Sequence, residues 1–175
     1  LEITIGINPL ATDSDSDGLN DTWEYTRISQ GYNYSPGNND TDGDGVQDGD
    51  EDLDTDGLTN LEEINTYGTN PLDEDSDGDT LWDGDEAKPW EIDKDGINNQ
   101  YNYPSNPNNL DSDGDGLSDY EEVTPSNDTY DSRTDPEDSD TDGDGLSDYD
   151  EIRWYWNITG DNNTARSYYD EQGWN

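Results

Sequence analysis

The feature that most restricts the fold of this chain is an acidic pattern of twelve residues that recurs along it. Aspartate stands at positions 1, 3 and 5, glycine at 6, an apolar residue at 7, aspartate or asparagine at 9 and glutamate at 12. Six copies begin at Asp13, Asp40, Asp52, Asp75, Asp111 and Asp140, and the fourth has Thr80 at position 6. A degenerate seventh segment, 91–102, keeps Asp93 and Asp95 but ends in Asn102. Six copies with one spacing exclude an accident of composition, whereas the seventh alone does not.

Apolar burial cannot order such a chain. Leu, Ile and Val number only 11, 9 and 2, and Phe is absent. Chains in which these residues make up less than roughly 20%, and whose net charge is high, are expected to be disordered. Here 48 acidic residues stand against 6 basic ones, and the net charge of −42 opposes any compact state. We therefore expect bound multivalent cations to provide the free energy of folding.

Calcium is the cation that the spacing fits, because it takes about 6–8 oxygen ligands in a flexible shell. Three carboxylates at alternate positions can turn onto one ion, and glycine at position 6 permits the sharp turn. Position 7 would lend its main-chain carbonyl, position 9 an oxygen directly or through water, and glutamate at position 12 two oxygens. Magnesium prefers a smaller octahedron and keeps its water, so these carboxylate-rich loops favour calcium. With six near-complete loops, we expect six or more calcium ions. The candidate ligands are Asp13, Asp15, Asp17, Leu19, Asp21, Glu24, Asp40, Asp42, Asp44, Val46, Asp48, Glu51, Asp52, Asp54, Asp56, Leu58, Asn60, Glu63, Asp75, Asp77, Asp79, Leu81, Asp83, Glu86, Asp93, Asp95, Asp111, Asp113, Asp115, Leu117, Asp119, Glu122, Asp140, Asp142, Asp144, Leu146, Asp148 and Glu151.

Several segments resemble a known family. The loops at 111–119 (DSDGDGLSD) and 140–148 (DTDGDGLSD) are similar to thrombospondin type 3 repeats, in the form common in bacterial and archaeal surface proteins. The leaders GTNPLD (68–73), PSNP (104–107) and RTDP (133–136), each ahead of an acidic loop, agree with it. The resemblance covers roughly residues 13–151. It implies calcium-loaded loops wrapped around ions, little regular structure, and an extracellular role in adhesion or matrix.

EF-hands and dockerins share the loop but fit less well. An EF-hand loop carries its apolar residue at position 8 and follows a helix, whereas here the apolar residue is at 7 and the preceding segments hold Pro36, Pro71, Pro107 and Pro136. After the loops, 61–67 predicts a helix ending at Gly68, and 23–28 and 148–156 predict similar short turns. The expected fold is mostly irregular: tandem EF-hand-like calcium loops each followed by a short helix, an N-terminal β-strand, and a small hydrophobic core or none.

The two ends differ from the repeats. Residues 1–7 alternate apolar and polar, which predicts a β-strand that pairs within its own chain or adds to a neighbouring subunit. The aromatic side chains near the C-terminus would form a satellite core or the acceptor for that strand: Trp154, Tyr155, Trp156, Tyr168, Tyr169 and Trp174. We accordingly predict three segments, an N-terminal strand and assembly segment (1–12), the repeat region (13–151) and an aromatic-rich segment (152–175).

Composition argues against several function classes. Without Cys or His, a disulfide, a zinc site or a catalytic imidazole is not expected. Phosphates would be repelled, so nucleic acid is a poor partner. No stretch approaches the ~20 apolar residues of a membrane span. Paired carboxylates are better explained as calcium ligands than as an acidic hydrolase, so we expect no enzyme. The absence of Met argues against a calcium sensor with a Met-rich groove.

Location is predicted from weaker signals. The chain begins with Leu1 rather than Met, which indicates a processed product or a fragment from which any signal peptide has gone. Sequons at Asn33, Asn39, Asn127, Asn157 and Asn162 predict glycosylation, and a sixth at Asn20 lies inside a loop. Tyrosines in the linkers could contact glycans or simply cover the loops. These signals fit an extracellular or cell-surface protein.

Two functions remain. The first is a calcium-rigidified structural subunit that assembles with itself, through strand 1–7 and the aromatic C-terminus, into a filament, tube, sheath or surface layer. The alternative is a calcium-stiffened stalk or adhesion module of a larger cell-surface protein.

Overall fold

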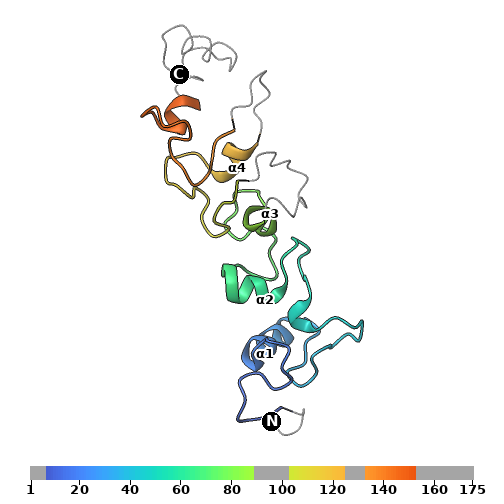
Figure 1. The fold of residues 1–175 in the computed structure, drawn as a ribbon. Coiled ribbons are helices and arrows are strands. Elements are labelled where there is room, and N and C mark those ends of the chain that lie inside the picture. The colour runs from blue at the N-terminus through green and yellow to red at the C-terminus, as the bar shows by residue number, and fades with distance from the viewer. Residues whose placement is uncertain (1–6, 89–102, 125–132, 153–175) are drawn as a thin grey trace. The chain divides into compact units, whose positions relative to one another are not determined.

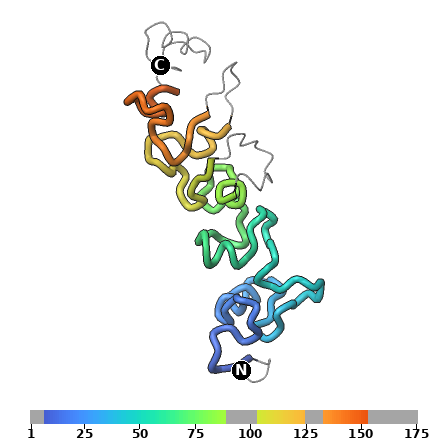
Figure 2. Tube along the Cα trace, in the orientation of Figure 1, coloured from blue at the N-terminus to red at the C-terminus, as the bar shows by residue number. Residues whose placement is uncertain are grey.

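The computed structural model describes residues 7–88, 103–124 and 133–152. The chain forms two compact units, Leu1–Asp73 and Glu74–Asn175. The first unit contains helix α1 (Asp21–Gln30), the 3₁₀ turn η2 (Asp48–Asp50), helix α2 (Asn60–Glu62) and the π-helical turn η3 (Glu63–Tyr67). The second contains α3 (Asp83–Ala87) and α4 (Asp119–Val123), and residues 148–152 are also helical (Figure 1). Turns and irregular backbone connect these elements (Figure 2).

A helical segment begins at position 9 of each acidic loop, and in α1, α2 and α4 the side chain at position 8 caps it, whereas Gln47 and Trp82 make no such cap for η2 and α3. The Asn20 side chain accepts a hydrogen bond from the main-chain N–H of Trp23 at 2.9 Å and caps α1. Thr59 and Ser118 cap α2 and α4 in the same way, each completed by a glutamate that reaches back to the cap. These caps satisfy main-chain donors that a short helix leaves open. The predicted stop at Gly68 is observed, with a left-handed φ of 77°.

The prediction of an N-terminal β-strand is wrong. No residue within 7–88, 103–124 or 133–152 belongs to a strand, and Ile7, the one described residue of segment 1–7, has irregular backbone. Residues 1–6 lie outside the described part. Alternation over a few residues marks a strand only where a neighbour supplies the hydrogen-bonding partner, and a single sequence segment carries no information about that neighbour.

The interior is lined by carboxylates more than by apolar side chains. In the described residues, seven apolar side chains are buried, and so are twelve aspartates and glutamates. Four of the apolar seven are leucines at position 7 of their loops: Leu19, Leu58, Leu81 and Leu117. The equivalent Val46 and Leu146 are 42% and 37% exposed, so a position-7 side chain packs inside only some of the loops. No helix among the described residues has the length and apolar character that crossing a membrane requires.

Candidate metal centres

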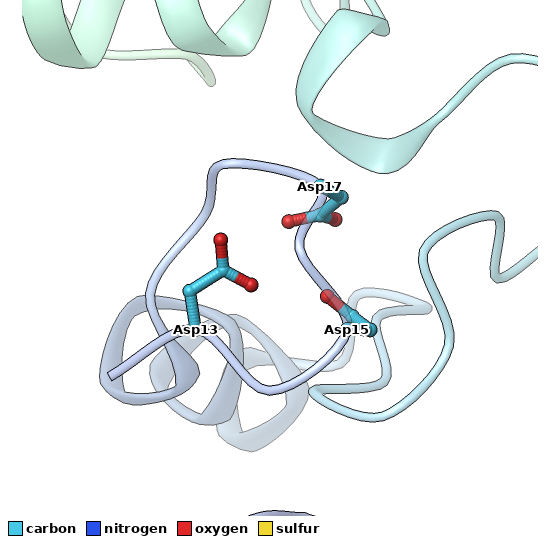
Figure 3. Close-up of side chains that lie close together, drawn as sticks. All are labelled: Asp13, Asp15 and Asp17. Atoms are coloured by element: carbon cyan, nitrogen blue, oxygen red, sulfur yellow. The ribbon is translucent and has the colours of Figure 1, made fainter. Parts of the chain in front are cut away.

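The first three carboxylates of each loop in the N-terminal unit converge. The side chains of Asp13, Asp15 and Asp17 turn toward one space enclosed by their loop (Figure 3). One carboxylate oxygen from each lies within 4.8 Å of the others. The same grouping is made by positions 1, 3 and 5 of the loops that start at Asp40 and Asp52.

Hydrogen bonds to the main chain hold these carboxylates in place. Asp13 accepts the N–H of Ser16 at 2.7 Å and that of Gly18 at 3.1 Å, which folds the loop around its first aspartate. Asp17 accepts the N–H of Leu19 at 2.8 Å. The corresponding bonds recur in loops of both units, so one local geometry is repeated.

That geometry requires two left-handed residues in each loop. Position 4 has a φ between 68° and 82° in all six loops, and position 6 has a φ between 90° and 108°. Glycine adopts these angles without steric cost, which explains the frequent D-G-D-G sequence. Position 6 was expected to need glycine. Position 4 has the same requirement, met by glycine in four of the loops and by Ser16 and Thr55 in the other two.

The aspartate at position 9 also forms two hydrogen bonds with the residue at position 2, a role that the spacing of the ligands did not indicate. Both carboxylate oxygens of Asp21 accept hydrogen bonds from Ser14, one from its N–H and one from its hydroxyl, each at 2.8 Å. The same pairing joins positions 2 and 9 in four further loops: Thr41–Asp48, Ser76–Asp83, Ser112–Asp119 and Thr141–Asp148. The signal was visible in the sequence, because every loop with Asp at position 9 has Ser or Thr at position 2, whereas the remaining loop has Leu53 and Asn60.

A second carboxylate group spans two consecutive loops. Asp48, at position 9 of its own loop, lies with Asp17 and Glu24 of the preceding loop, and one oxygen from each is within 4.8 Å of the others. Their side chains are 1%, 3% and 0% exposed. Both carboxylate oxygens of Glu24 are buried and have no hydrogen-bond partner among the described residues. A buried carboxylate without a partner is costly, and a cation in this space would remove the cost.

The second unit repeats this relationship. Burial raises the pKa of Glu86 and Asp79, and the charge of Asp119, at position 9 of the next loop, adds to the rise in both. Asp148 is affected in the same way by Asp115 of its preceding loop. Glutamate at position 12 also interacts with its own loop, since burial, followed by the charges of Asp142 and the other loop aspartates, raises the pKa of Glu151.

The electrostatics of these groups call for a positive ion. Burial, followed by neighbouring carboxylates, raises the pKa of Glu24 to about 8. Burial raises the pKa of Glu86 to about 10 and that of Glu122 to about 8. Burial also raises the pKa of Asp17 and Asp79 to about 6. All the donors in these groups are oxygens, and no Lys or Arg contributes to these pKa shifts. The residues therefore fit a hard divalent cation, which would restore the ionised form of the carboxylates.

Some predicted residues cannot be placed. Asp93, Asp95, Asn127, Asn157, Asn162 and the C-terminal aromatic residues from Trp154 on lie outside the described part. Of the remaining predicted sequons, Asn33 is exposed and Asn39 is partly exposed. The ligand set and the glycosylation sites both stay predictions.

Comparison with known proteins supports the resemblance noted in the sequence. The family model of the bacterial TSP3 repeat, the thrombospondin type 3 repeat, matches residues 40–54, 52–74, 111–124 and 140–153. These matches contain four of the six loops, and the recognition of thrombospondin type 3-like repeats is confirmed. No curated protein and no solved structure gives a significant match to the chain.

Proposed function

Because four segments of the chain match the bacterial thrombospondin type 3 repeat, a structural calcium-binding module rather than an enzyme family, we propose that this protein is an extracellular structural module ordered by calcium. The observation that carries the proposal is the buried group of Asp17, Glu24 and Asp48. Three carboxylates in one buried space repel one another, and the chain offers them few basic residues, so a compact fold needs cations there.

The ions would occupy two kinds of position. One is the space inside each loop, between the carboxylates of positions 1, 3 and 5, as for Asp13, Asp15 and Asp17. The other is the space between consecutive loops, where position 9 of one meets positions 5 and 12 of the loop before it. We propose six or more calcium ions on this basis, with the second kind of position linking one repeat to the next.

The finer role is that of a structural subunit, rigid when loaded with calcium, of a filament, tube, sheath or surface layer. The concentration of aromatic residues in segment 152–175 supports self-association, because such side chains are enriched where proteins meet. The alternative is a stalk or adhesion module of a larger surface protein, which the tandem repeats support equally. The exposed Asn33 supports glycan attachment in either case.

Electron microscopy of the purified protein before and after a strong chelator, with metal content determined alongside, tests this function. Ordered assemblies that hold at least six calcium ions per chain and fall apart with the chelator are the expected result. Calcium-loaded particles that remain single would retain the calcium module and favour the stalk. Order that persists without bound metal would overturn the proposal.

A further inference from the structure

A hydroxyl side chain contacts the buried glutamate that ends three of the loops. The pairs, with their oxygen–oxygen distances, are Thr69–Glu63 (3.3 Å), Ser105–Glu86 (2.8 Å) and Thr134–Glu122 (2.9 Å). In each pair the hydroxyl donates to Oε1 of the glutamate. The hydroxyl residues are 8–9% exposed and the glutamates 0–1%, so water competes little for these bonds.

The contact does not follow from local helix geometry. The two partners are 6, 19 and 12 residues apart in the three cases, yet the same atoms meet. What the three hydroxyl residues share is their distance from the next loop, since each stands six residues before the aspartate that opens it. The hydroxyl is therefore a fixed part of the leader segment, whatever the length of chain that precedes it.

Main-chain bonds extend the contact into the next loop. The N–H of Ser105 donates to the carbonyl of Glu86 at 3.3 Å, and the N–H of Asn106 donates to the hydroxyl of Ser112 at 2.9 Å. That hydroxyl in turn donates to Asp119 at 2.7 Å. One continuous set of hydrogen bonds thus runs from the glutamate of one loop to the position-9 aspartate of the next.

The other glutamate oxygen is left for a different partner. Oε2 of Glu86 and Oε2 of Glu122 are buried and have no hydrogen-bond partner among the described residues. Burial raises the pKa of Glu122, and the charges of Asp113 and Asp115, its own loop carboxylates, raise it further. The hydroxyl therefore engages Oε1 and leaves a buried Oε2 that a cation could bind.

The chain contains its own comparison. Six residues before Asp40, the leader position is occupied by Tyr34, whose ring packs edge-on against Trp23 and whose hydroxyl accepts a hydrogen bond from Asn60. Glu24, the glutamate of the preceding loop, has neither oxygen hydrogen-bonded within the described residues. At this leader, which has Tyr in place of Ser or Thr, the hydroxyl contact to the preceding glutamate is absent.

We propose that Thr69, Ser105 and Thr134 are positioning residues that fix the glutamate of the preceding loop for calcium. The hydroxyl holds one carboxylate oxygen and selects the side-chain orientation in which the other meets the ion. This role rests on the proposed function, because it presupposes that the loops bind calcium.

Hydrogen exchange of the full chain, read by mass spectrometry across a calcium titration, tests the role loop by loop. Thr134→Val removes the hydroxyl at similar volume, and Thr134→Ser keeps it. The quantity compared is the calcium concentration at which the amides of residues 111–122 reach half of their maximal protection from hydrogen exchange (half-protection). We expect Thr134→Val to raise this concentration roughly tenfold, as loss of a hydrogen bond to a charged group predicts. Thr134→Ser should match the wild type, and full protection should return at saturating calcium in both variants. Residues 13–24 serve as the internal reference.

Each result separates the alternatives. An unchanged midpoint in Thr134→Val, or an equal shift in Thr134→Ser, would overturn the positioning role. Protection that stays low in Thr134→Val at saturating calcium would show a purely structural contact and also overturn it. Ser105→Ala with Ser105→Thr repeats the test on residues 75–86 in case one variant misfolds. A wild-type chain with no calcium-dependent protection would instead refute the proposed function itself.

Discussion

The main-chain N–H of Tyr149 donates a 2.6 Å hydrogen bond to Oδ2 of Asp115, thirty-four residues earlier in the chain. Oδ1 of the same aspartate accepts the N–H of Leu117, inside its own loop. Asp115 therefore accepts hydrogen bonds from its own loop and from the helical segment of the next loop, and so links the two. Tyr120 makes the equivalent bond to Asp79 at 2.8 Å, so the link recurs within the second unit.

Removal of calcium should melt the loops of one unit together. The shared aspartates join consecutive loops, and few apolar side chains are present to keep them compact once the carboxylates lose their ions. At calcium concentrations about 10–100 times the dissociation constant, each site adds roughly 1.4–2.7 kcal/mol to stability. Titration with a chelator, followed by small-angle X-ray scattering, should show a sharp increase in radius of gyration. Magnesium at equal concentration is the control and should not restore the compact form.

Two adjacent glutamates provide a matched pair of variants. Glu122 is fully buried beside the carboxylates of its loop, whereas Glu121 is exposed and caps the helix through Ser118. Glu122→Gln should lower the number of calcium ions bound per chain, because it removes a charged ligand while keeping the volume. Glu121→Gln should leave that number unchanged and cost at most about 1 kcal/mol through the weaker cap. Calorimetric titration measures the number of calcium ions bound by each variant. An equal number in the two variants would contradict the assignment of Glu122 as a calcium ligand.

Position 9 shows how far the sequence could lead. The spacing of Asp13, Asp15 and Asp17 predicted carboxylates around one space, because alternate residues of a tight loop can reach a single ion. The place of Asp48 beside Glu24 could not be predicted this way. It depends on how one loop packs against the next, and that packing follows from contacts such as Tyr149 to Asp115 that have no local sequence signature.

Two further differences have the same origin. The alternation in residues 1–7 predicted a strand, but a strand needs a partner that the pattern does not specify. Position 7 was interpreted only as a source of a carbonyl ligand, yet Leu58 and Leu117 are 0% and 1% exposed and form part of the small apolar interior. A repeated pattern of twelve residues shows which positions are alike, whereas burial depends on the neighbouring repeat.

Acid should partly replace calcium. In the calcium-free chain, burial raises the pKa of Glu24 from 4.5 to about 8 and that of Glu86 from 4.5 to about 10. Between the unfolded and the folded pKa of each glutamate, the folded state binds more protons than the unfolded state. The stability that these groups contribute is therefore fully present at low pH and is lost as pH rises through the raised pKa values. The calcium-free protein should be more compact at pH 5.5 than at pH 8.5, although ordinary Asp and Glu, with pKa values near about 4, are ionised at both.

Small-angle scattering at the two pH values measures this difference. With saturating calcium the radius of gyration should be the same at both, because the ions hold the carboxylates ionised. Calcium added at pH 7 in weak buffer should also release protons. A calcium-free radius that does not change with pH would show that Glu24 and Glu86 are not each buried among the carboxylates of their own unit in the metal-free chain.

Thr80 is the position at which the repeat departs from its own pattern. It has a φ of 90° at position 6, where the other five loops have glycine. A β-branched residue held in the left-handed region costs on the order of 1–3 kcal/mol. Replacing Thr80 by glycine removes this strain, but the greater freedom of glycine in the unfolded chain cancels about 0.5–1 kcal/mol of the stabilisation. Thr80→Gly should therefore lower the calcium concentration for half-protection of residues 75–86 by roughly fivefold.

Gly145→Thr is the matched reverse change for that experiment. Gly145 occupies position 6 of its loop with a φ of 98°, and a Cβ added there would meet no atom within 4 Å. Its substitution thus tests the backbone angle without a packing clash, and it should raise the calcium midpoint of residues 140–151 by a similar factor. If Thr80→Gly weakens its loop while Gly145→Thr has no effect, backbone strain at position 6 does not govern calcium affinity, and the Thr80 side chain must instead stabilise its loop through contacts of its own.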